Sequence, residues 1–346
     1  MTRSHGTEGR QMQRCFASFD GKGKSPSLGE LAEDLLARQR ENWPGLIEGY
    51  EALSAARTRR IDGDGWSVRV QFNPRRIVSS GAKLDPESIR RRPCFLCPEN
   101  LPPEQQSIRY RDDFLILCNP APIFPGHWTI SSIRHSPQSL SGQLGIFLRL
   151  AADFGPRMTV FYNGPQAGAS APDHLHFQAA QAGQMPVEQE IRDRGKRIES
   201  KPSDGVKISR TAGLGRGILL IEGKSEEKVI TVTEKAIRSI GRLTSTDGEP
   251  KLNVLCTRAA EEWRLLLFPR LKHRPDAYFR EGAERLLISP GAADMGGVII
   301  TPREQDFLAL TPDLVSSLFR EVAFDDAKTG AVLGLLSEKD QGQFFT

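Results

Sequence analysis

The chain has 346 residues, of which 38% are hydrophobic and 26% charged, as in an ordinary globular protein. Its 47 basic and 43 acidic residues leave a formal net charge of only +4, which argues against a nucleic-acid-binding protein built on one strong basic patch. No apolar run approaches the roughly 20 residues that cross a bilayer, and the polar start lacks the apolar core of a signal peptide. We therefore expect a cytoplasmic protein without nucleic-acid or membrane partners, long enough for one large domain or two ordinary ones.

The N-terminal part predicts a polar tail followed by helices. Residues 1–25 are polar and glycine-rich, which is typical of a mobile tail. Apolar residues at near-helical spacing between Ser27 and about Arg59 predict two helices, divided at Pro44. Ser27 and Glu30 fit a capping box at the start of the first helix.

The rest of the chain alternates predicted strands and helices. Strands are expected at 66–72, 114–118, 127–130, 158–162, 174–178, 217–221, 229–232, 252–256, 263–268 and 297–301. Helices are expected at 137–154, through the charged connector after about Gly183 to Ser200, at 234–243, and from near Pro302 and Pro312. Two hairpins are expected, one from 114–118 with 127–130 and one from 158–162 with 174–178. Because the order of strands and helix restarts after residue 200, the second half resembles the first.

A basic loop follows the strand at 66–72. Its cationic residues are Arg75, Arg76, Lys83, Arg90, Arg91 and Arg92. A loop of this kind is either a solvated charged surface or a site that handles phosphate groups. Its place beside a cysteine pair favours the second interpretation.

The five cysteines are too few and too unevenly spaced for a disulfide framework, and only Cys94 and Cys97 form a close pair. Their spacing lets two thiolates hold one metal ion, and His135 and His174 downstream would complete a tetrahedral Cys₂His₂ site of the structural type. A redox pair and two unliganded buried thiols are the alternatives. Prolines on both sides of the pair, and the basic loop before it, argue against a redox motif.

The stretch from Gly168 to Gln178 carries the strongest chemical signal. On a strand, His174, His176 and Gln178 would share one face while two apolar side chains between them anchor the other. Both histidines could bind a catalytic metal, or one could be a metal ligand and the other a nucleophile, or both could be ordinary buried histidines. A neutral histidine beside amide and backbone donors is suited to attack a phosphorus atom.

The segment 163–178, which contains His-Leu-His-Phe-Gln, resembles the active-site signature of the histidine-triad superfamily in its transferase branch. That branch contains galactose-1-phosphate uridylyltransferase, diadenosine tetraphosphate phosphorylase and the GDP-hexose phosphorylases. The hydrolase branch has a third histidine where this chain has Gln178, so the resemblance favours transfer over hydrolysis. It implies an α+β fold of antiparallel sheets with flanking helices, with two histidine-triad-like halves fused in one chain. The expected divisions are an N-terminal tail with helices at 1–60, a catalytic half at 61–183 and a second half at 184–346 that completes the substrate cleft.

The resemblance also implies residue roles. His176 would be the nucleophile that forms a nucleotidyl-histidine intermediate, and Gln178 would hold the α-phosphate oxygens. The expected substrate contacts are Asn163, Gly168, Ser170, Arg75, Arg76, Lys83, Arg270 and His273, and the expected ligands of a structural zinc ion are Cys94, Cys97, His135 and His174.

These expectations combine into a two-step nucleotidyl transfer. The donor would be a nucleotide sugar or a dinucleoside polyphosphate, and the acceptor inorganic phosphate or a sugar phosphate. The alternatives are a nucleotide hydrolase that uses the same histidine and a zinc-stabilised nucleotide-binding protein without turnover. Relatives often dimerise, so a homodimer is a further possibility.

Overall fold

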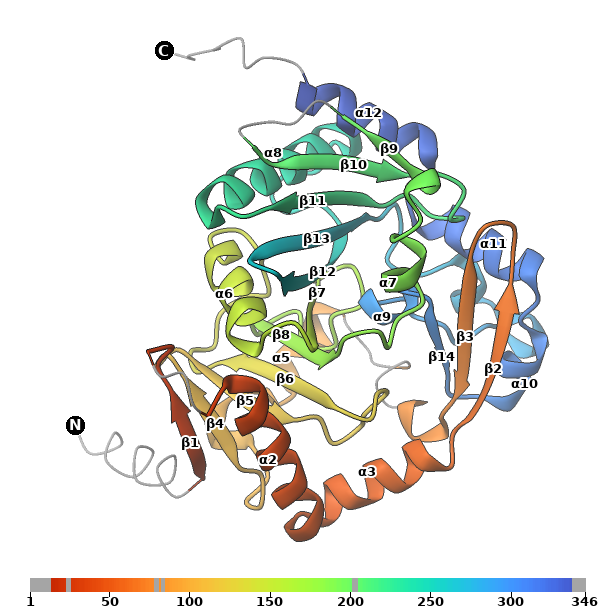
Figure 1. The fold of residues 1–346 in the computed structure, drawn as a ribbon. Coiled ribbons are helices and arrows are strands. Elements are labelled where there is room, and N and C mark those ends of the chain that lie inside the picture. The colour runs from red at the N-terminus through yellow and green to blue at the C-terminus, as the bar shows by residue number, and fades with distance from the viewer. Residues whose placement is uncertain (1–13, 23–25, 78–80, 82–84, 201–204, 338–346) are drawn as a thin grey trace.

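The computed structural model describes residues 14–22, 26–77, 81, 85–200 and 205–337, which form two sheets flanked by helices (Figure 1). In spatial order the strands of the 11-stranded main sheet in these residues are β1 (Cys15–Phe19), β4 (Ser107–Tyr110), β5 (Phe114–Cys118), β6 (His127–Ser132), β8 (His176–Gln181), β7 (Met158–Asn163), β12 (Leu252–Ala259), β13 (Glu262–Pro269), β11 (Leu219–Gly223), β10 (Lys207–Thr211) and β9 (Arg197–Glu199). The 3-stranded sheet has the order β14 (Val298–Thr301), β3 (Ser67–Phe72), β2 (Arg57–Asp62). Neighbours in the main sheet are antiparallel except the edge pair β1 and β4. The expected α+β class with antiparallel sheets is confirmed.

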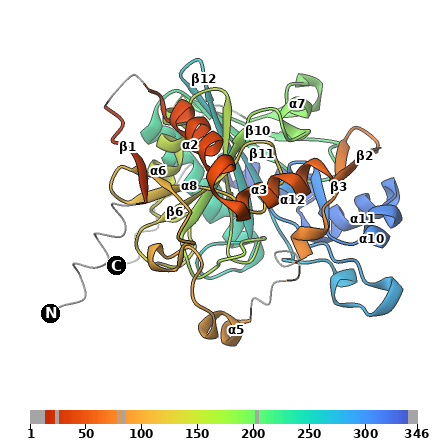
Figure 2. The ribbon, with the colours of Figure 1, turned by 90° about the horizontal axis from the view of Figure 1, so that it is seen from below.

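The α-helices lie on both faces of the main sheet and at the periphery of the molecule (Figure 1 and Figure 2). They are α2 (Leu28–Asn42), α3 (Pro44–Ser54), α5 (Pro86–Arg91), α6 (Leu144–Phe154), α7 (Val187–Glu190), α8 (Glu226–Thr244), α9 (Ala292–Met295), α10 (Glu304–Ala309), α11 (Pro312–Val322) and α12 (Asp326–Ser337). Figure 1 shows α6 and α8 on one side of the main sheet and the smaller sheet with α10 and α11 on the other. In Figure 2, α5 lies at the periphery, away from the main sheet.

Two apolar cores follow from the alternation of side chains along the strands. Val254 of β12 packs into the core beneath α2, α6 and α8, while the next residue, Leu255, packs into the core shared with the smaller sheet. Phe177 of β8 lies in the first core, where its ring contacts Phe147 with a centroid separation of 5.2 Å. The main sheet is therefore buried on both faces along its central strands.

The central pair β7 and β12 joins the strands that precede residue 183 to those that follow it. The pairing is antiparallel, with Asn163 opposite Asn253 and Tyr162 opposite Val254. A second link is the parallel pairing of β14 with β3, so a strand near the C-terminus completes a sheet that begins near the N-terminus. The division at residues 60 and 183 stays a prediction, and β2 spans the first of these positions.

Several expected elements are present. Helices α2 and α3 meet at Pro44 with the capping box of Ser27 and Glu30, and both expected hairpins pair antiparallel. The helix expected at 137–154 begins only at Leu144.

The expected strand at 229–232 is wrong, because these residues belong to α8. Ser225 caps this helix by accepting a hydrogen bond from the backbone N–H of Lys228. Val229, Val232 and Ile240 are buried on one side of it, which is helical spacing. Burial of this face overrides the preference of β-branched residues for strands.

The connector and some edge strands also differ from expectation. Between residues 184 and 200 only α7 is α-helical, and the segment ends in β9. The predicted N-terminal helical region ends at Ser54, and Arg57–Asp62 forms β2 because it pairs with β3. Strand β1 within the predicted polar tail and the final helix α12 were not expected. β1 pairs with the distant β4, whereas β2 is mostly charged and pairs with the neighbouring β3, so neither strand has a strong pattern of its own.

Among the described residues, no helix combines the length and the apolar composition that a membrane span requires.

A substitution at Phe177 tests how much the first core, directly behind the two histidines, contributes to stability. We expect Phe177→Ala to lower the free energy of unfolding by about 3–5 kcal/mol, because it removes a fully buried ring and leaves a cavity. Urea denaturation measures this change, and Phe279→Ala, at a side chain that is 69% exposed, is the control. Equal stability of the two variants would contradict this account of the core.

Candidate active site

A cavity of about 860 Å³ lies where the loops after β3 and α5 meet the carboxyl end of β7, the start of β8 and the segment before α9. Six of the residues expected from the sequence line it: Asn163, Gly168, Ser170, His176, Gln178 and Arg76. Residues from the C-terminal part of the chain, including Arg274, Ser289 and Asp294, form the opposite part of the wall. The cavity therefore draws on segments from both sides of the β7–β12 pair.

His176 is the first residue of β8 and is held at both its backbone and its ring. Its backbone N–H donates to Gln138 Oε1 at 2.8 Å, and Gln138 Nε2 donates back to the carbonyl oxygens of His176 and Asn163. The ring Nδ1 lies 2.8 Å from the carbonyl oxygen of His174. Because a carbonyl oxygen can only accept, Nδ1 carries the proton and Nε2 keeps its lone pair.

Burial makes this ring neutral. The loss of hydration lowers the pKa of His176 to about 4, more than the contact with the His174 carbonyl raises it. At neutral pH the side chain is therefore an uncharged imidazole with an unprotonated Nε2, which is the form that acts as a nucleophile.

Gln178 lies two residues further along β8, and its amide is oriented by a histidine that the sequence did not single out. His127 Nδ1 accepts the backbone N–H of Ile123 at 3.3 Å, so His127 Nε2 carries the proton. That nitrogen lies 2.8 Å from Gln178 Oε1. Since the oxygen of the Gln178 amide is engaged, its NH₂ group is left to donate to a ligand in the cavity.

His127 is enclosed rather than solvated. Burial lowers its pKa to about 3, and its ring stacks on Phe161 with a centroid separation of 5.9 Å. It therefore stays neutral with a defined tautomer. Only the pairing of β6 with β8 brings His127 close to Gln178, and nothing local to residue 127 indicates this contact.

Asn163 and Gly168 join the two sides of the cavity. Asn163 Oδ1 accepts from the backbone N–H of Ala292 at 2.6 Å and from Asn253 Nδ2 at 2.9 Å. Gly168 has a φ of +94°, and a Cβ there would lie 2.6 Å from Gly291 Cα. The close approach thus needs glycine at residue 168.

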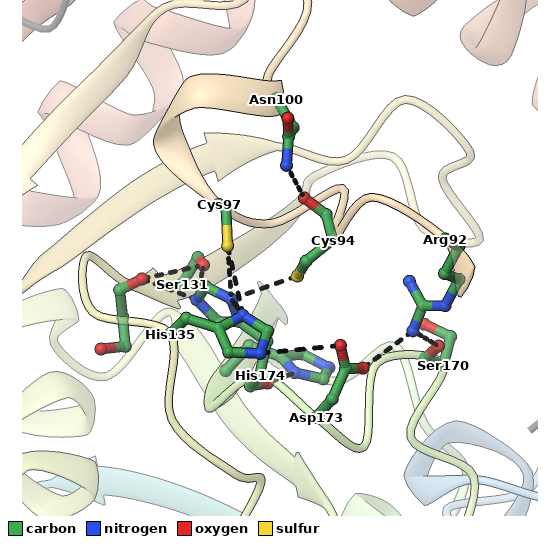
Figure 3. Close-up of polar contacts among 11 residues, drawn as sticks. Arg92, Cys94, Cys97, Asn100, Ser131, His135, Ser170, Asp173 and His174 are labelled. Carbon is green, nitrogen blue, oxygen red and sulfur yellow. Dashed lines mark hydrogen bonds and ion pairs between the residues drawn. The ribbon is translucent and has the colours of Figure 1, made fainter. Parts of the chain in front are cut away.

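Next to the cavity, Cys94, Cys97, His135 and His174 gather in one cluster (Figure 3). Their ligand atoms all lie within 4.8 Å of one another. His174 Nδ1 is 3.2 Å from Cys94 Sγ and 3.5 Å from Cys97 Sγ. His135 Nδ1 is 3.2 Å from both Cys97 Sγ and His174 Nδ1. His174 precedes β8, so the expectation that it shares a strand face with His176 and Gln178 is wrong.

The cluster fits a tetrahedral metal ion. A tetrahedron with about 2.0–2.3 Å from its centre to each donor has edges of about 3.3–3.8 Å, close to the four separations of 3.2, 3.2, 3.2 and 3.5 Å given above. His174 Nε2 lies 2.8 Å from the carbonyl oxygen of Ser132, so the proton sits there and Nδ1 offers its lone pair to the cluster. Burial and the Cys94 thiol raise the pKa of Cys97 to about 12, so a bound cation would be what ionises the thiol of Cys97. The four residues can therefore hold one metal ion.

The basic residues expected to bind anions are distributed differently. Arg76 lines the cavity, whereas Arg75 forms a surface ion pair with Glu48. Lys83 lies outside the described residues.

Arg270 and His273 are not among the described residues that line the cavity. Arg270 is fully buried, and its guanidinium donates to Asn253 Oδ1 and to the carbonyl oxygens of Pro290 and Val322. It turns inward directly after β13, where these acceptors are gathered. Arg274, rather than Arg270, lines the cavity, and its Nε donates to Ser289 Oγ at 2.9 Å.

Metal content tests the cluster. We expect elemental analysis of the purified protein to find one divalent metal ion per chain, and Cys94→Ser to lose it because only one thiolate then remains. Cys15→Ser, at a partly exposed cysteine outside the cluster, is the control and should retain the metal. Wild-type protein without stoichiometric metal would exclude a resident ion.

Comparison with known proteins identifies the fold. A family profile described as a domain of unknown function (DUF4922) matches residues 35–181. No curated protein sequence matches the chain. The crystal structure of yeast Ap4A phosphorylase Apa2 aligns with a TM-score of 0.56 and 18% sequence identity, covering 86% of this chain and 94% of that one. Its complex with Ap4A aligns with a TM-score of 0.58 and 16% identity, covering 86% and 97%, and its complex with AMP with a TM-score of 0.57 and 16% identity, covering 85% and 95%. The chain therefore shares the fold of this Ap4A phosphorylase, in agreement with the resemblance carried by the signature around His176.

Proposed function

We propose that this protein is a nucleotidyltransferase or phosphorylase that transfers a nucleotidyl group through His176. The observation that carries the proposal is the state of His176, a neutral ring with an unprotonated Nε2. His176 lines the cavity together with Gln178, whose amide is oriented by His127. The donor is a nucleotide sugar or a dinucleoside polyphosphate, and the acceptor is inorganic phosphate or a sugar phosphate. The likeness to an Ap4A phosphorylase supports a nucleotide as substrate.

In the first step, His176 Nε2 attacks the α-phosphorus of the donor. A nitrogen–phosphorus bond forms, and the bond from phosphorus to the bridging oxygen breaks, so the phosphorylated remainder leaves with that electron pair. The ring becomes positively charged, and the carbonyl oxygen of His174 stabilises the proton at Nδ1. In the second step an acceptor oxygen attacks the same phosphorus and releases neutral His176.

Charge on the cavity wall supports a substrate with several phosphate groups. Its cationic residues are Arg76, Arg91, Arg92 and Arg274, against the single acidic residue Asp294 among the described lining residues. Burial raises the pKa of Asp294 to about 6, so this carboxyl takes up a proton only below neutral pH. A cavity of about 860 Å³ with this excess of arginine suits a nucleotide together with a second phosphorylated group.

The C-terminal part of the chain would supply the acceptor side of the site. Arg274 and Ser289 lie on that part of the wall, and the contact of Asn163 with Ala292 holds it against β7. This arrangement supports two fused halves of which only the first carries the nucleophile.

Zinc is the metal that the donor set of the cluster favours, because two thiolates and two imidazoles in a closed tetrahedral set are typical of structural zinc sites. When bound, zinc would supply a cross-link between the cysteine loop and the turn before β8. His174 contributes its ring to the cluster and its carbonyl oxygen to His176 Nδ1. The cluster would therefore brace the nucleophile without touching the substrate.

Intact-mass measurement tests the intermediate. After incubation with Ap4A, ADP-glucose, UDP-glucose or GDP-mannose under conditions that preserve phosphoramidates, we expect one donor to add a single nucleotidyl group to the wild-type chain. His176→Ala should give no adduct, because the attacking nitrogen is absent. Release of product that depends on added phosphate or sugar phosphate identifies a transferase, and release into buffer alone identifies a hydrolase. Tight nucleotide binding without adduct or product would contradict both.

His127 tests the orientation of Gln178. We expect His127→Phe to lower kcat by about 10- to 100-fold, because the amide of Gln178 can then rotate away from the phosphate. The aromatic replacement keeps the packing against Phe161, so the thermal midpoint of unfolding should change little. The double variant His127→Phe with Gln178→Ala should lose little more kcat than the single variant Gln178→Ala. Additive losses would show that His127 does not act through Gln178.

A further inference from the structure

Arg92 lies between the metal-binding cluster and the cavity (Figure 3). It follows α5 and stands two residues before Cys94. Its side chain is 25% exposed, and its guanidinium carbon lies 5.0 Å from the ring centroid of Phe95. On one edge, NH2 lies 2.8 Å from Asp173 Oδ1 and 3.4 Å from the carbonyl oxygen of Ser170.

The other edge of this guanidinium lacks a hydrogen-bond acceptor. Arg92 NH1 is buried and has no hydrogen-bond partner among the described residues. Arginine keeps its charge in proteins, so a buried guanidinium nitrogen without an acceptor is unfavourable. An anion entering the cavity would supply the missing acceptor.

Arg270 is an arginine with a purely structural set of hydrogen bonds and serves as a comparison for Arg92. Its Nε, NH1 and NH2 all donate to protein oxygens, and it is not among the described residues that line the cavity. Arg92 instead lines the cavity and leaves NH1 without an acceptor. Arg270 therefore has an acceptor for every nitrogen of its guanidinium, as a structural arginine does, whereas Arg92 keeps one nitrogen without an acceptor at the cavity, as a ligand-binding arginine does.

Asp173 connects Arg92 to the cluster. Its Oδ1 binds Arg92, and its Oδ2 lies 3.9 Å from His135 Nε2, the ring nitrogen opposite the one that faces the cysteines. Asp173 also directly precedes His174 in the chain. One carboxylate thus contacts the anion-binding arginine and a residue of the metal cluster.

We propose that Arg92 binds a phosphate oxygen of the substrate and that Asp173 is a positioning residue that holds Arg92 between the cavity and the metal cluster. This rests on the proposed function for the identity of the ligand as a phosphorylated compound. Ser170 and His176 line the same cavity, so a phosphate group held by Arg92 would lie in the compartment of the nucleophile. Occupancy of the metal cluster would then affect anion affinity, because the cluster fixes the turn that carries Asp173.

Calorimetric binding of ADP and of inorganic pyrophosphate to the full-length, metal-containing protein tests Arg92. We expect Arg92→Gln to weaken both ligands by about 10- to 100-fold, and Arg92→Lys by less, because lysine keeps the charge without the planar fork. Arg109→Gln breaks an Arg–Asp pair of 2.9 Å at the surface and is the matched control, with unchanged affinity expected. Metal content is measured in every variant and should stay at the wild-type level in Arg92→Gln.

A double-mutant cycle tests Asp173. We expect Asp173→Asn alone to weaken ADP binding by roughly 3- to 10-fold, and to have almost no further effect when added to Arg92→Gln. Wild-type affinity in Arg92→Gln would overturn the proposal, and additive losses in the cycle would overturn the role of Asp173. These binding measurements do not require attack by His176. A protein that binds ADP through Arg92 but forms no nucleotidyl adduct would therefore refute the proposed function and leave this inference standing.

Discussion

The hydrogen bond from His176 Nδ1 to the carbonyl oxygen of His174 is the contact on which the site depends. It fixes the tautomer that leaves Nε2 able to attack, and burial keeps the ring uncharged. The same residue, His174, directs its own ring toward two cysteines and donates from Nε2 to the carbonyl oxygen of Ser132. A single turn before β8 therefore determines the orientation of the His176 ring and completes a cluster that can hold a metal ion, and any change in that turn would disturb both.

Around this turn the protein arranges neutral groups with defined hydrogen-bond polarity. His127 directs the amide of Gln178, and Gln138 fixes the backbone of His176 to the end of β7. These groups are buried and need no proton exchange to present a donor or a lone pair. Positive charge is carried by arginines of the cavity wall. This division suits a reaction in which charge moves through a phosphoryl group, because preorganised donors need little rearrangement as that charge develops.

The continuity of the main sheet explains how one cavity can use residues more than a hundred positions apart. Pairing of β7 with β12 places Asn163 beside Asn253, and Asn163 then accepts the backbone N–H of Ala292 from a third segment. Gly168 permits the close approach of the loop that leads to His176. The site is therefore a product of long-range strand pairing, while its chemistry is concentrated in a short stretch of the chain.

The sequence alone determined the features that depend on local pattern. These include the helices that meet at Pro44, the capping box at Ser27, the hairpins, the cysteine pair and the signature that ends at Gln178. Each rests on spacing or on a cap within a few residues, and such signals are set before any tertiary contact forms. The resemblance carried by the signature extended this to the fold class, and it led to the prediction that His176 is the nucleophile.

Tertiary structure alone decided which distant side chains line the cavity and which contact its lining residues. His127 and Asp173 acquire their roles through partners brought together by strand pairing and by the turn before β8, and Arg274 lines the wall where Arg270 turns inward to buried carbonyl oxygens. Packing also converted the β-branched segment at 229–232 into part of α8, because one face of that helix is buried against the sheet. In each case the favourable free energy comes from burial or from a hydrogen-bond acceptor far away in the chain. A local sequence pattern contains neither.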